Sequence, residues 1–138
     1  LDPATGNGAF YNALLNLNKS DIGFWGMDID DEILNDEIYQ QGNCFVENRD
    51  FIKNPPRKKF KSIVANPPYI RHHRIDEDTK LLLKKLAISS IGSSIDGRAG
   101  FHIYFFIQVL KYLEKDGKLA IILPADSCEG KFASVLWN

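Results

Sequence analysis

Residues 66–69 read Asn-Pro-Pro-Tyr and follow a short apolar run at residues 62–65. The run predicts a strand, and in an open parallel sheet ligands bind outside the carboxyl ends of the strands. Each proline fixes φ at about −65° and lacks an N–H, so the neighbouring carbonyl groups point in set directions. The segment therefore offers an amide oxygen, a backbone carbonyl and an aromatic face, which suits a flat group that carries an NH₂. Taken alone, the four residues are also compatible with a turn and a packed tyrosine.

A loop with two glycines forms a second candidate site at residues 2–8, Asp-Pro-Ala-Thr-Gly-Asn-Gly. A dinucleotide loop needs three glycines, but Tyr11 occupies the third place, and the Lys-Ser/Thr pair of a P-loop is absent. Asp2 would repel a phosphate and attract a cationic group. S-adenosylmethionine fits, because it carries an ammonium and a sulfonium. The alternative is a loop that merely caps the following helix.

An acidic residue follows each of the next two expected strands. Asp28 comes 20 residues after Gly8, the usual position of an acid that bonds ribose hydroxyls. We expect Ile29 to lie against an adenine ring and Asp30 to cap the next helix, although Asp28 could be the cap instead. Asp50 could accept a hydrogen bond from the adenine amino group.

Phe51 follows Asp50 and could cover the same ring. A surface turn at residues 48–51 is the alternative interpretation of this segment.

The elements that must position these residues alternate between strand and helix, which favours an α/β fold with a parallel sheet. Apolar spacing after Gly8 predicts a first helix. The expected strands are residues 23–30, 44–46, 62–65 and 118–123, and the further expected helices are residues 32–41, 79–87 and 101–113. A polar loop is expected at residues 89–100, and Asp116-Gly117 reads as a turn.

Length and composition narrow the possibilities further. The 138 residues fit one domain, with 44% apolar residues, a net charge of −1 and a pI of about 6.3. Any nucleic acid would therefore be bound by local patches or by parts of the protein beyond this chain. No apolar run reaches the roughly 18 residues of a membrane span, and no signal peptide is visible. Two separated cysteines, Cys44 and Cys128, predict neither a disulfide framework nor a metal site, so we expect a reduced, cytoplasmic protein.

The two ends of the chain predict a piece of a longer protein. Leu1 reads as the last residue of a strand, and residues 135–138 lie inside an apolar segment.

Together these segments resemble S-adenosylmethionine-dependent N6-adenine DNA methyltransferases, in particular the Eco57I-like methylases of restriction-modification systems. Residues 2–10 are similar to the family's cofactor loop, D-P-x-x-G-x-G-x-F, and residues 66–69 to its catalytic [D/N/S]-P-P-[Y/F/W] motif. Asp28 and Asp50 match the two acids that contact the cofactor. The stretches Asn-Pro-Pro-Tyr-Ile-Arg-His-His and Gly-Lys-Leu-Ala-Ile-Ile-Leu-Pro are also similar to this group.

The resemblance implies a Rossmann-like, doubly wound and mainly parallel sheet of the class I methyltransferase type, truncated at both ends. It implies a partial catalytic domain over residues 1–138, with the target-recognition domain absent. The implied catalytic residues are Asn66, Pro67, Pro68 and Tyr69. The implied cofactor-binding residues are Asp2, Pro3, Thr5, Gly6, Gly8, Phe10, Asp28, Ile29, Asp50 and Phe51. The cofactor is S-adenosylmethionine and no metal is required.

DNA is the implied substrate, reached through the full-length protein, and nothing in the sequence fixes the oligomeric state. The same motif also serves methylation of glutamine amides in proteins and of guanine amines in RNA, and an inactive fragment is a third possibility. Residues 71–74, Arg-His-His-Arg, either contact DNA or form a solvated loop, while the basic run at residues 57–61 reads as a solvated face.

Overall fold

The computed structural model describes residues 1–19, 21–95, 99–125, 127 and 133. Cys128 and the apolar segment at residues 135–138 lie outside the described residues. The chain divides into two compact units. The sheet unit comprises Leu1–Asn66 and Leu113–Ile121, and the helical unit comprises Pro67–Tyr112 and Ile122–Asn138.

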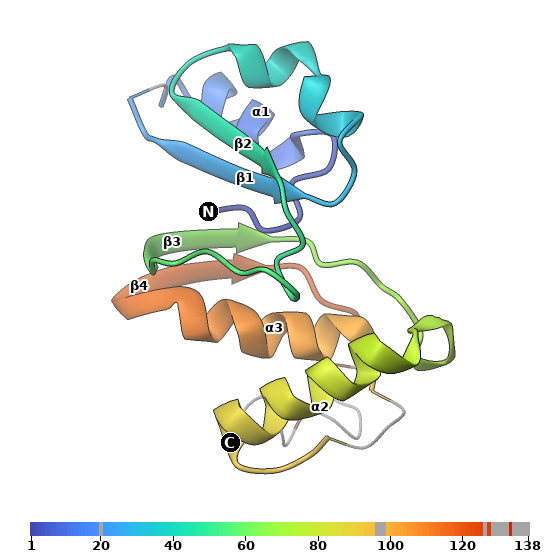
Figure 1. The fold of residues 1–138 in the computed structure, drawn as a ribbon. Coiled ribbons are helices and arrows are strands. Elements are labelled where there is room, and N and C mark those ends of the chain that lie inside the picture. The colour runs from blue at the N-terminus through green and yellow to red at the C-terminus, as the bar shows by residue number, and fades with distance from the viewer. Residues whose placement is uncertain (20, 96–98, 126, 128–132, 134–138) are drawn as a thin grey trace. The chain divides into compact units, whose positions relative to one another are not determined.

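The sheet unit contains two pairs of parallel strands (Figure 1). β1 (Phe24–Asp28) pairs with β2 (Cys44–Asn48), and Asp28 lies opposite Asn48 at their carboxyl ends. β3 (Phe60–Ala65) pairs with β4 (Leu113–Ile121). The β3–β4 register shifts between Phe60 and Ser62, opposite the expected turn, where Asp116 has a φ of 63°.

Leu1 and Asp2 connect the two strand pairs by hydrogen bonds. The Asp2 amide donates to the Trp25 carbonyl (2.8 Å), and the Met27 amide donates to the Asp2 carbonyl (2.9 Å). On the other side, the Leu1 amine donates to the Ser62 carbonyl, and the Val64 amide donates to the Leu1 carbonyl, each at 2.9 Å. The Asp2–Gly26 bridge is parallel. These pairings align the first two residues with β1 and β3.

α1 (Ala9–Asn16) packs on β1 because its apolar residues recur at helical spacing. A core of three aromatic rings, Tyr11, Phe24 and Tyr39, lies beneath it. The rings of Tyr11 and Phe24 are 4.7 Å apart between centroids. The first expected helix and the strands at β1, β2 and β3 are therefore confirmed, with small shifts of their ends.

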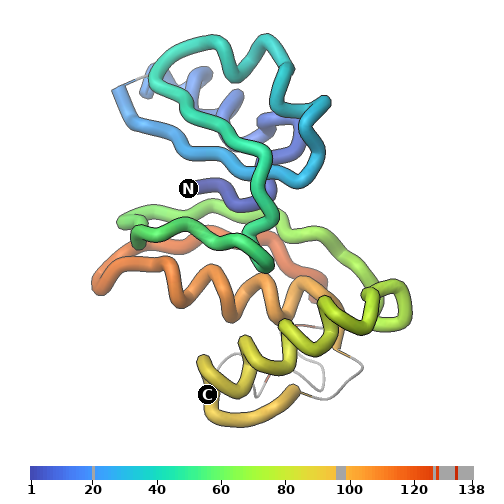
Figure 2. Tube along the Cα trace, in the orientation of Figure 1, coloured from blue at the N-terminus to red at the C-terminus, as the bar shows by residue number. Residues whose placement is uncertain are grey.

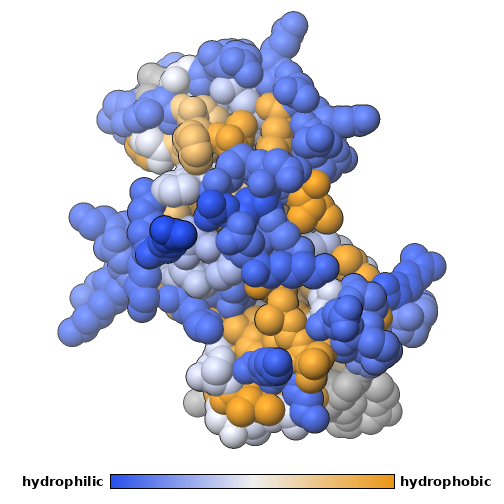
Figure 3. Space-filling model, in the orientation of Figure 1, coloured by the Kyte–Doolittle hydropathy of each residue, from blue (hydrophilic) through white to orange (hydrophobic). Residues whose placement is uncertain are grey.

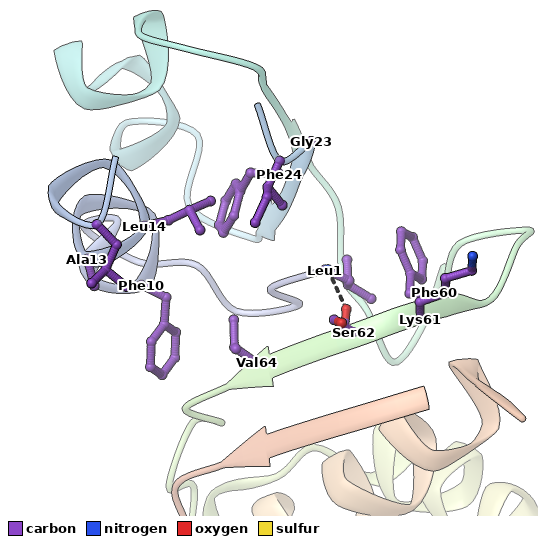
Figure 4. A pocket seen from close by; sticks show the side chains of 12 residues that line it. Leu1, Phe10, Ala13, Leu14, Gly23, Phe24, Phe60, Lys61, Ser62 and Val64 are labelled. Carbon is purple, nitrogen blue, oxygen red and sulfur yellow. Dashed lines mark hydrogen bonds between the residues drawn. The ribbon is translucent and has the colours of Figure 1, made fainter. Parts of the chain in front are cut away.

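An apolar cavity of about 550 Å³ lies between α1, the start of β1 and β3 (Figure 4). Phe10 points from α1 toward Val64 of β3, and Leu14 points toward Phe24 of β1. The walls of this cavity carry few polar groups, so it does not suit a ligand with charged ends.

The helix expected over residues 32–41 is wrong. The segment forms two short 3₁₀ helices instead, η1 (Ile33–Asn35) and η2 (Glu37–Gln40). Asp36 between them has extended backbone and accepts a hydrogen bond from the Ile38 amide (3.1 Å). Aspartate side chains compete for nearby amides in this way, which ends one helix and begins the next.

The helical unit contains η3 (His72–Arg74), α2 (Glu77–Ile91) and α3 (Phe101–Tyr112). Asp76 caps α2 by accepting from the Thr79 amide (2.8 Å), and Gly92 ends it. α2 thus continues beyond Ser89, where a loop was expected. α3 is confirmed and buries most of its side chains, including Tyr104, Phe105 and Phe106.

Figure 2 follows the loop from the end of β2 back to the start of β3 within the sheet unit. Figure 3 shows apolar surface over the helices of the helical unit. Leu81, Ile88 and Leu110 are exposed apolar residues of this unit. The fold is mixed α/β with parallel strands. Among the described residues, no helix is both long and apolar enough to cross a membrane.

Candidate functional site

Four predicted site residues lie at or just beyond the ends of parallel strands in the sheet unit. Asp2 is paired with β1, Asp28 ends β1, Asp50 follows β2, and Asn66 follows β3. Because the strands run in parallel, their carboxyl ends lie at one edge of the unit.

Asp2 is a buried carboxylate at the base of the glycine loop, with no exposed surface. Its Oδ1 accepts from the Ala4 amide at 3.3 Å, while Oδ2 has no hydrogen-bond partner among the described residues. Burial raises the pKa of Asp2 from 3.8 to about 6, although the hydrogen bond from the Ala4 amide opposes this shift. A buried acceptor that lacks a partner is a good position for a cationic or N–H-bearing ligand group.

Gly6 is held at the apex of the loop. Its amide donates to Asp28 Oδ2 at 2.9 Å, and the Thr5 amide donates to the Met27 carbonyl at 2.9 Å. A Cβ placed on Gly6 would meet nothing within 4 Å. The loop is therefore tied to β1 on one side and open on the other, which allows a ligand to approach the backbone closely.

Gly8 caps α1 and is surrounded. Its φ of 73° is left-handed, and a Cβ there would lie 3.0 Å from Ile38 Cγ2 and 3.1 Å from the Tyr39 hydroxyl. Glycine is required here because a Cβ would be strained by the left-handed φ and would also crowd Ile38 and Tyr39.

Asp28 and Asp30 both accept hydrogen bonds from nearby backbone amides. Asp30 Oδ1 accepts from the Glu32 amide at 3.1 Å in a local turn. Asp30 does not cap the next helix as expected, because the residue that precedes η1 is Glu32, which makes no side-chain cap. Asp28 Oδ1 accepts from the Asp30 amide at 3.1 Å, in addition to the Gly6 contact. Ile29 is 72% exposed, so its side chain is accessible to an incoming ring. The structure thus adds a role that the sequence did not suggest, the tie between Asp28 and the loop.

Asp50 and Phe51 form a compact turn. Asp50 Oδ1 accepts from the amides of Ile52 (2.8 Å) and Lys53 (3.0 Å). Phe51 is buried, with 2% of its surface exposed. The turn that was the alternative interpretation is therefore present, and it fixes the carboxylate of Asp50 beyond β2.

The other predicted cofactor residues are placed as follows. Pro3 and Thr5 are buried in the loop. The side chain of Phe10 lines the apolar cavity of Figure 4 together with Val64. Phe10 is therefore placed apart from the loop residues that surround Gly6.

The Asn-Pro-Pro-Tyr segment spans the point where the sheet unit ends and the helical unit begins, between Asn66 and Pro67. Asn66 is exposed, Pro67 is buried and Pro68 is half-buried. Tyr69 is 51% exposed. Its hydroxyl donates to the Ile122 carbonyl at 3.1 Å.

Two contacts within the helical unit hold the segment beyond Pro68. The ring of Tyr69 meets that of His102 edge-on, with centroids 5.8 Å apart. The Phe101 amide at the start of α3 donates to the Ile70 carbonyl at 2.9 Å. Tyr69 is therefore held through its hydroxyl and through the ring of His102, while about half of its surface is exposed.

Sequence reasoning missed three residues at these sites: Tyr39, Asn48 and His102. Asn48 donates to the Ile29 carbonyl at 3.0 Å and joins the ends of β1 and β2. Tyr39 reaches Gly6 across 33 residues. Its apolar neighbours were a signal for a core position, but nothing in the sequence indicated its partner.

Residues 71–74 form η3 and its start, with exposed Arg71, His73 and Arg74. In the sheet unit, Lys58 Nζ lies 4.2 Å from the centre of the Trp25 ring. The basic run at residues 57–61 is thus partly packed on aromatic residues. Across the part of the chain that the structure describes, no group of three His, Cys, Asp or Glu residues could hold a metal ion.

Comparison with known proteins identifies related sequences over nearly the whole chain. Residues 8–136 match the family model described as Eco57I restriction-modification methylase. The chain is 24% identical over 141 residues to the type II methyltransferase M.AccI of Acinetobacter calcoaceticus, covering 99% of this chain and 25% of that protein.

Two further relatives are similar. The type II methyltransferase M.HincII of Haemophilus influenzae is 28% identical over 124 residues, covering 90% of this chain and 22% of its own length. The type II methyltransferase M.XamI of Xanthomonas campestris pv. amaranthicola is 34% identical over 86 residues, covering 62% of this chain and 16% of its own. The chain thus spans about a quarter or less of the length of these relatives.

Proposed function

The chain belongs to the Eco57I restriction-modification methylase family, and we propose that it is the catalytic part of an adenine-N6 DNA methyltransferase. In this proposal the full-length protein transfers a methyl group from S-adenosylmethionine to DNA. The single observation that carries it is the edge of the sheet unit, where the glycine loop, Asp28, Asp50 and Asn66 follow successive parallel strands. The type II methyltransferases named above support DNA as the substrate.

The residues at this edge fit the cofactor. Asp2, with its unpartnered buried oxygen, would accept hydrogen bonds from the ammonium of the methionine end. Asp28 would accept from the ribose hydroxyls, and the exposed side chain of Ile29 would cover the adenine ring. Asp50 would accept from the adenine amino group. S-adenosylmethionine, when bound, supplies a methyl group activated by a positively charged sulfur.

The target amino group is a poor nucleophile, because its lone pair is delocalised into the base. Asn66 Oδ1 and the Pro67 carbonyl would accept its two N–H groups. These acceptors draw the nitrogen toward tetrahedral geometry, which localises the lone pair. Because Asn66 and Pro67 are consecutive, covalent geometry alone keeps the two acceptors close. Orientation of this kind supplies much of the rate enhancement in reactions between bound partners.

Tyr69, which is 51% exposed, would stack on the base, in the way that aromatic side chains hold unstacked bases. In duplex DNA the target base must leave the helix, at a cost of a few kcal/mol. Asn66 does not titrate, so the proton lost from the amino group would pass to solvent.

The proposal extends to the fold and to the organisation of the protein. Leu1 and Asp2 bridge β1 and β3, which supports one Rossmann-like sheet in the order β2, β1, residues 1–2, β3, β4. In this view residues 2–10 are the cofactor loop, residues 66–69 are the catalytic loop, and target recognition lies elsewhere in the full-length protein. Action on DNA in a restriction-modification system would place the protein in the cytoplasm.

An assay of substrate class tests the proposal. The full-length protein would be incubated with S-adenosylmethionine labelled in its methyl group and with DNA, a release-factor protein or ribosomal RNA. Label in the DNA, with none in the protein or RNA, is the expected result. Label in the protein or the RNA alone would show that the same motif serves another amino acceptor.

A further inference from the structure

Tyr39 lies 33 residues from the glycine loop in sequence but contacts it directly. It comes from η2 and is buried, with 5% of its surface exposed. Its hydroxyl donates to the Gly6 carbonyl at 2.6 Å and lies 3.1 Å from Thr5 Oγ1. A tyrosyl hydroxyl has one proton and a carbonyl can only accept. Tyr39 therefore donates to Gly6 and accepts from Thr5.

The Gly6 residue is thereby held at both of its backbone groups. Its amide donates to Asp28 Oδ2 at 2.9 Å, and its carbonyl accepts from Tyr39. With both groups engaged, the two peptide planes that flank Gly6 have fixed orientations. The Cβ side of Gly6 stays open, so the loop is fastened from within while a ligand can approach from outside.

Tyr39 is itself rigidly supported. Its ring stacks on Tyr11 with centroids 6.2 Å apart, and its hydroxyl is so close to Gly8 that a Cβ there would lie 3.1 Å away. Burial raises the pKa of Tyr39 above its ordinary value of 10, so the hydroxyl stays protonated and continues to donate near neutral pH. A buried tyrosine hydroxyl normally needs such a partner.

We propose that Tyr39 is a positioning residue for the cofactor loop, which keeps the Gly6 peptide in the orientation that receives S-adenosylmethionine. The identity of the ligand in this role rests on the proposed function. The ordering of the loop by Tyr39 does not, because it depends only on contacts within the chain. Because Tyr39 is buried and acts through the Gly6 carbonyl, it should affect cofactor affinity and leave the chemical step unchanged.

The test compares the full-length protein with its Tyr39→Phe and Tyr11→Phe variants. Tyr11 is a matched control, because it belongs to the same aromatic cluster and its hydroxyl donates to the Gln41 carbonyl, away from the loop. Hydrogen exchange is measured without ligand for the amides of residues 5–8 and normalised to those of β1 in the same protein. Normalisation removes any general loss of stability.

In Tyr39→Phe we expect normalised loop exchange to rise about tenfold, equivalent to about 1.4 kcal/mol. The Kd for S-adenosylmethionine, measured by calorimetry, should rise by a similar factor, and kcat at saturating cofactor should stay near that of the parent. Such a pattern indicates that the substitution weakens binding equally in the ground state and the transition state. In Tyr11→Phe both loop exchange and Kd should stay within twofold of the parent.

Unchanged loop exchange in Tyr39→Phe, or an equal rise in both variants, would overturn the role of Tyr39. If the unsubstituted full-length protein took up no S-adenosylmethionine, the proposed function would fail. Loop exchange would still decide whether Tyr39 fixes Gly6.

Discussion

The glycine loop and the Asn-Pro-Pro-Tyr segment are held in place in different ways. The loop owes its shape to distant partners, since Asp28 and Tyr39 bind the two sides of Gly6. The Asn-Pro-Pro-Tyr segment owes much of its stiffness to two prolines, whose φ is fixed covalently. The shape of the glycine loop therefore depends on several distant residues. The Asn-Pro-Pro-Tyr segment depends mainly on the Asn66 side chain and its own prolines.

The largest effect is expected from Asn66→Ala, which removes the side-chain acceptor of the second region. We expect kcat for methyl transfer by the full-length protein to fall about 100-fold or more, the scale of a lost orienting contact. The Kd for S-adenosylmethionine should stay within twofold, because Asn66 is not among the proposed cofactor-binding residues. Both are measured by label transfer and calorimetry.

Asn54→Ala is the control for this substitution, because Asn54 is also an exposed asparagine but lies outside both regions. Its kcat should match that of the parent. An Asn66→Ala variant as active as Asn54→Ala would contradict the proposed mechanism.

Gly8→Ala should disturb the first region through its packing. A left-handed φ costs a residue with a Cβ about 1–2 kcal/mol, and overpacking against Ile38 and Tyr39 adds about 1–3 kcal/mol. We expect the free energy of unfolding to fall by about 2–5 kcal/mol and the Kd for S-adenosylmethionine to rise about tenfold. Denaturant titration and calorimetry measure the two effects.

Gly92→Ala provides the matched comparison, because Gly92 has a φ of 74° but nothing within 4 Å of its Cβ position. It should lose only about 1–2 kcal/mol of stability and keep its cofactor affinity. Equal losses in the two variants would show that packing at Gly8 is unimportant.

Asp2 should make stability and cofactor binding respond to pH in opposite directions. Its pKa is about 6 when folded and 3.8 as the ordinary value, so the folded state holds the proton more tightly. Stability from this group is thus highest below pH 4 and falls by up to about 3 kcal/mol as pH rises through 6. A charged Asp2 attracts a cationic ligand, so the Kd for S-adenosylmethionine should weaken as pH falls below 6.

The Asp2→Asn variant separates these effects. At pH 7.5 it should be more stable than the parent, bind S-adenosylmethionine more weakly, and lose the pH dependence of both quantities between pH 4 and 6.5. Unfolding curves and titrations over this range provide the measurement. If the parent and the variant had the same pH profile, Asp2 would not be the group that causes the pH dependence of stability and cofactor affinity.

The smallest effect is expected from Tyr69→Phe, which loses one exposed hydrogen bond to Ile122 and keeps the ring. Such bonds contribute about 0.5–1.5 kcal/mol, so kcat should stay within about threefold of the parent. Tyr69→Ala removes the ring itself and should cost about 10-fold or more, because base stacking contributes about 1–3 kcal/mol. Equal kcat values in Phe and Ala variants would argue against stacking.

The two regions also differ in how far the sequence predicts them. Asp2, Asp28, Asp50 and Asn66 were predicted from residue type and from their place after strands, because parallel strands share an edge. The hydrogen bonds of Tyr39 could not be predicted, since its partner lies 33 residues away and only the folded chain brings them together.

Local competition explains the errors in the elements. The helix expected at residues 32–41 is interrupted because Asp36 binds the Ile38 amide. Conversely, α2 runs past Ser89 and ends at Gly92. The helix is capped at its start and packed along its length, and these contributions exceed the low helix propensity of two serines.

The identity of the methylated base tests the central claim most directly. DNA would be treated with the full-length protein and S-adenosylmethionine, digested to nucleosides and analysed by mass spectrometry. The account predicts N6-methyldeoxyadenosine, which should be absent when Asn66→Ala replaces the parent. Methylation of a cytosine ring carbon would contradict it, because Asn66 and Pro67 offer acceptors for an amino group and nothing for attack on carbon.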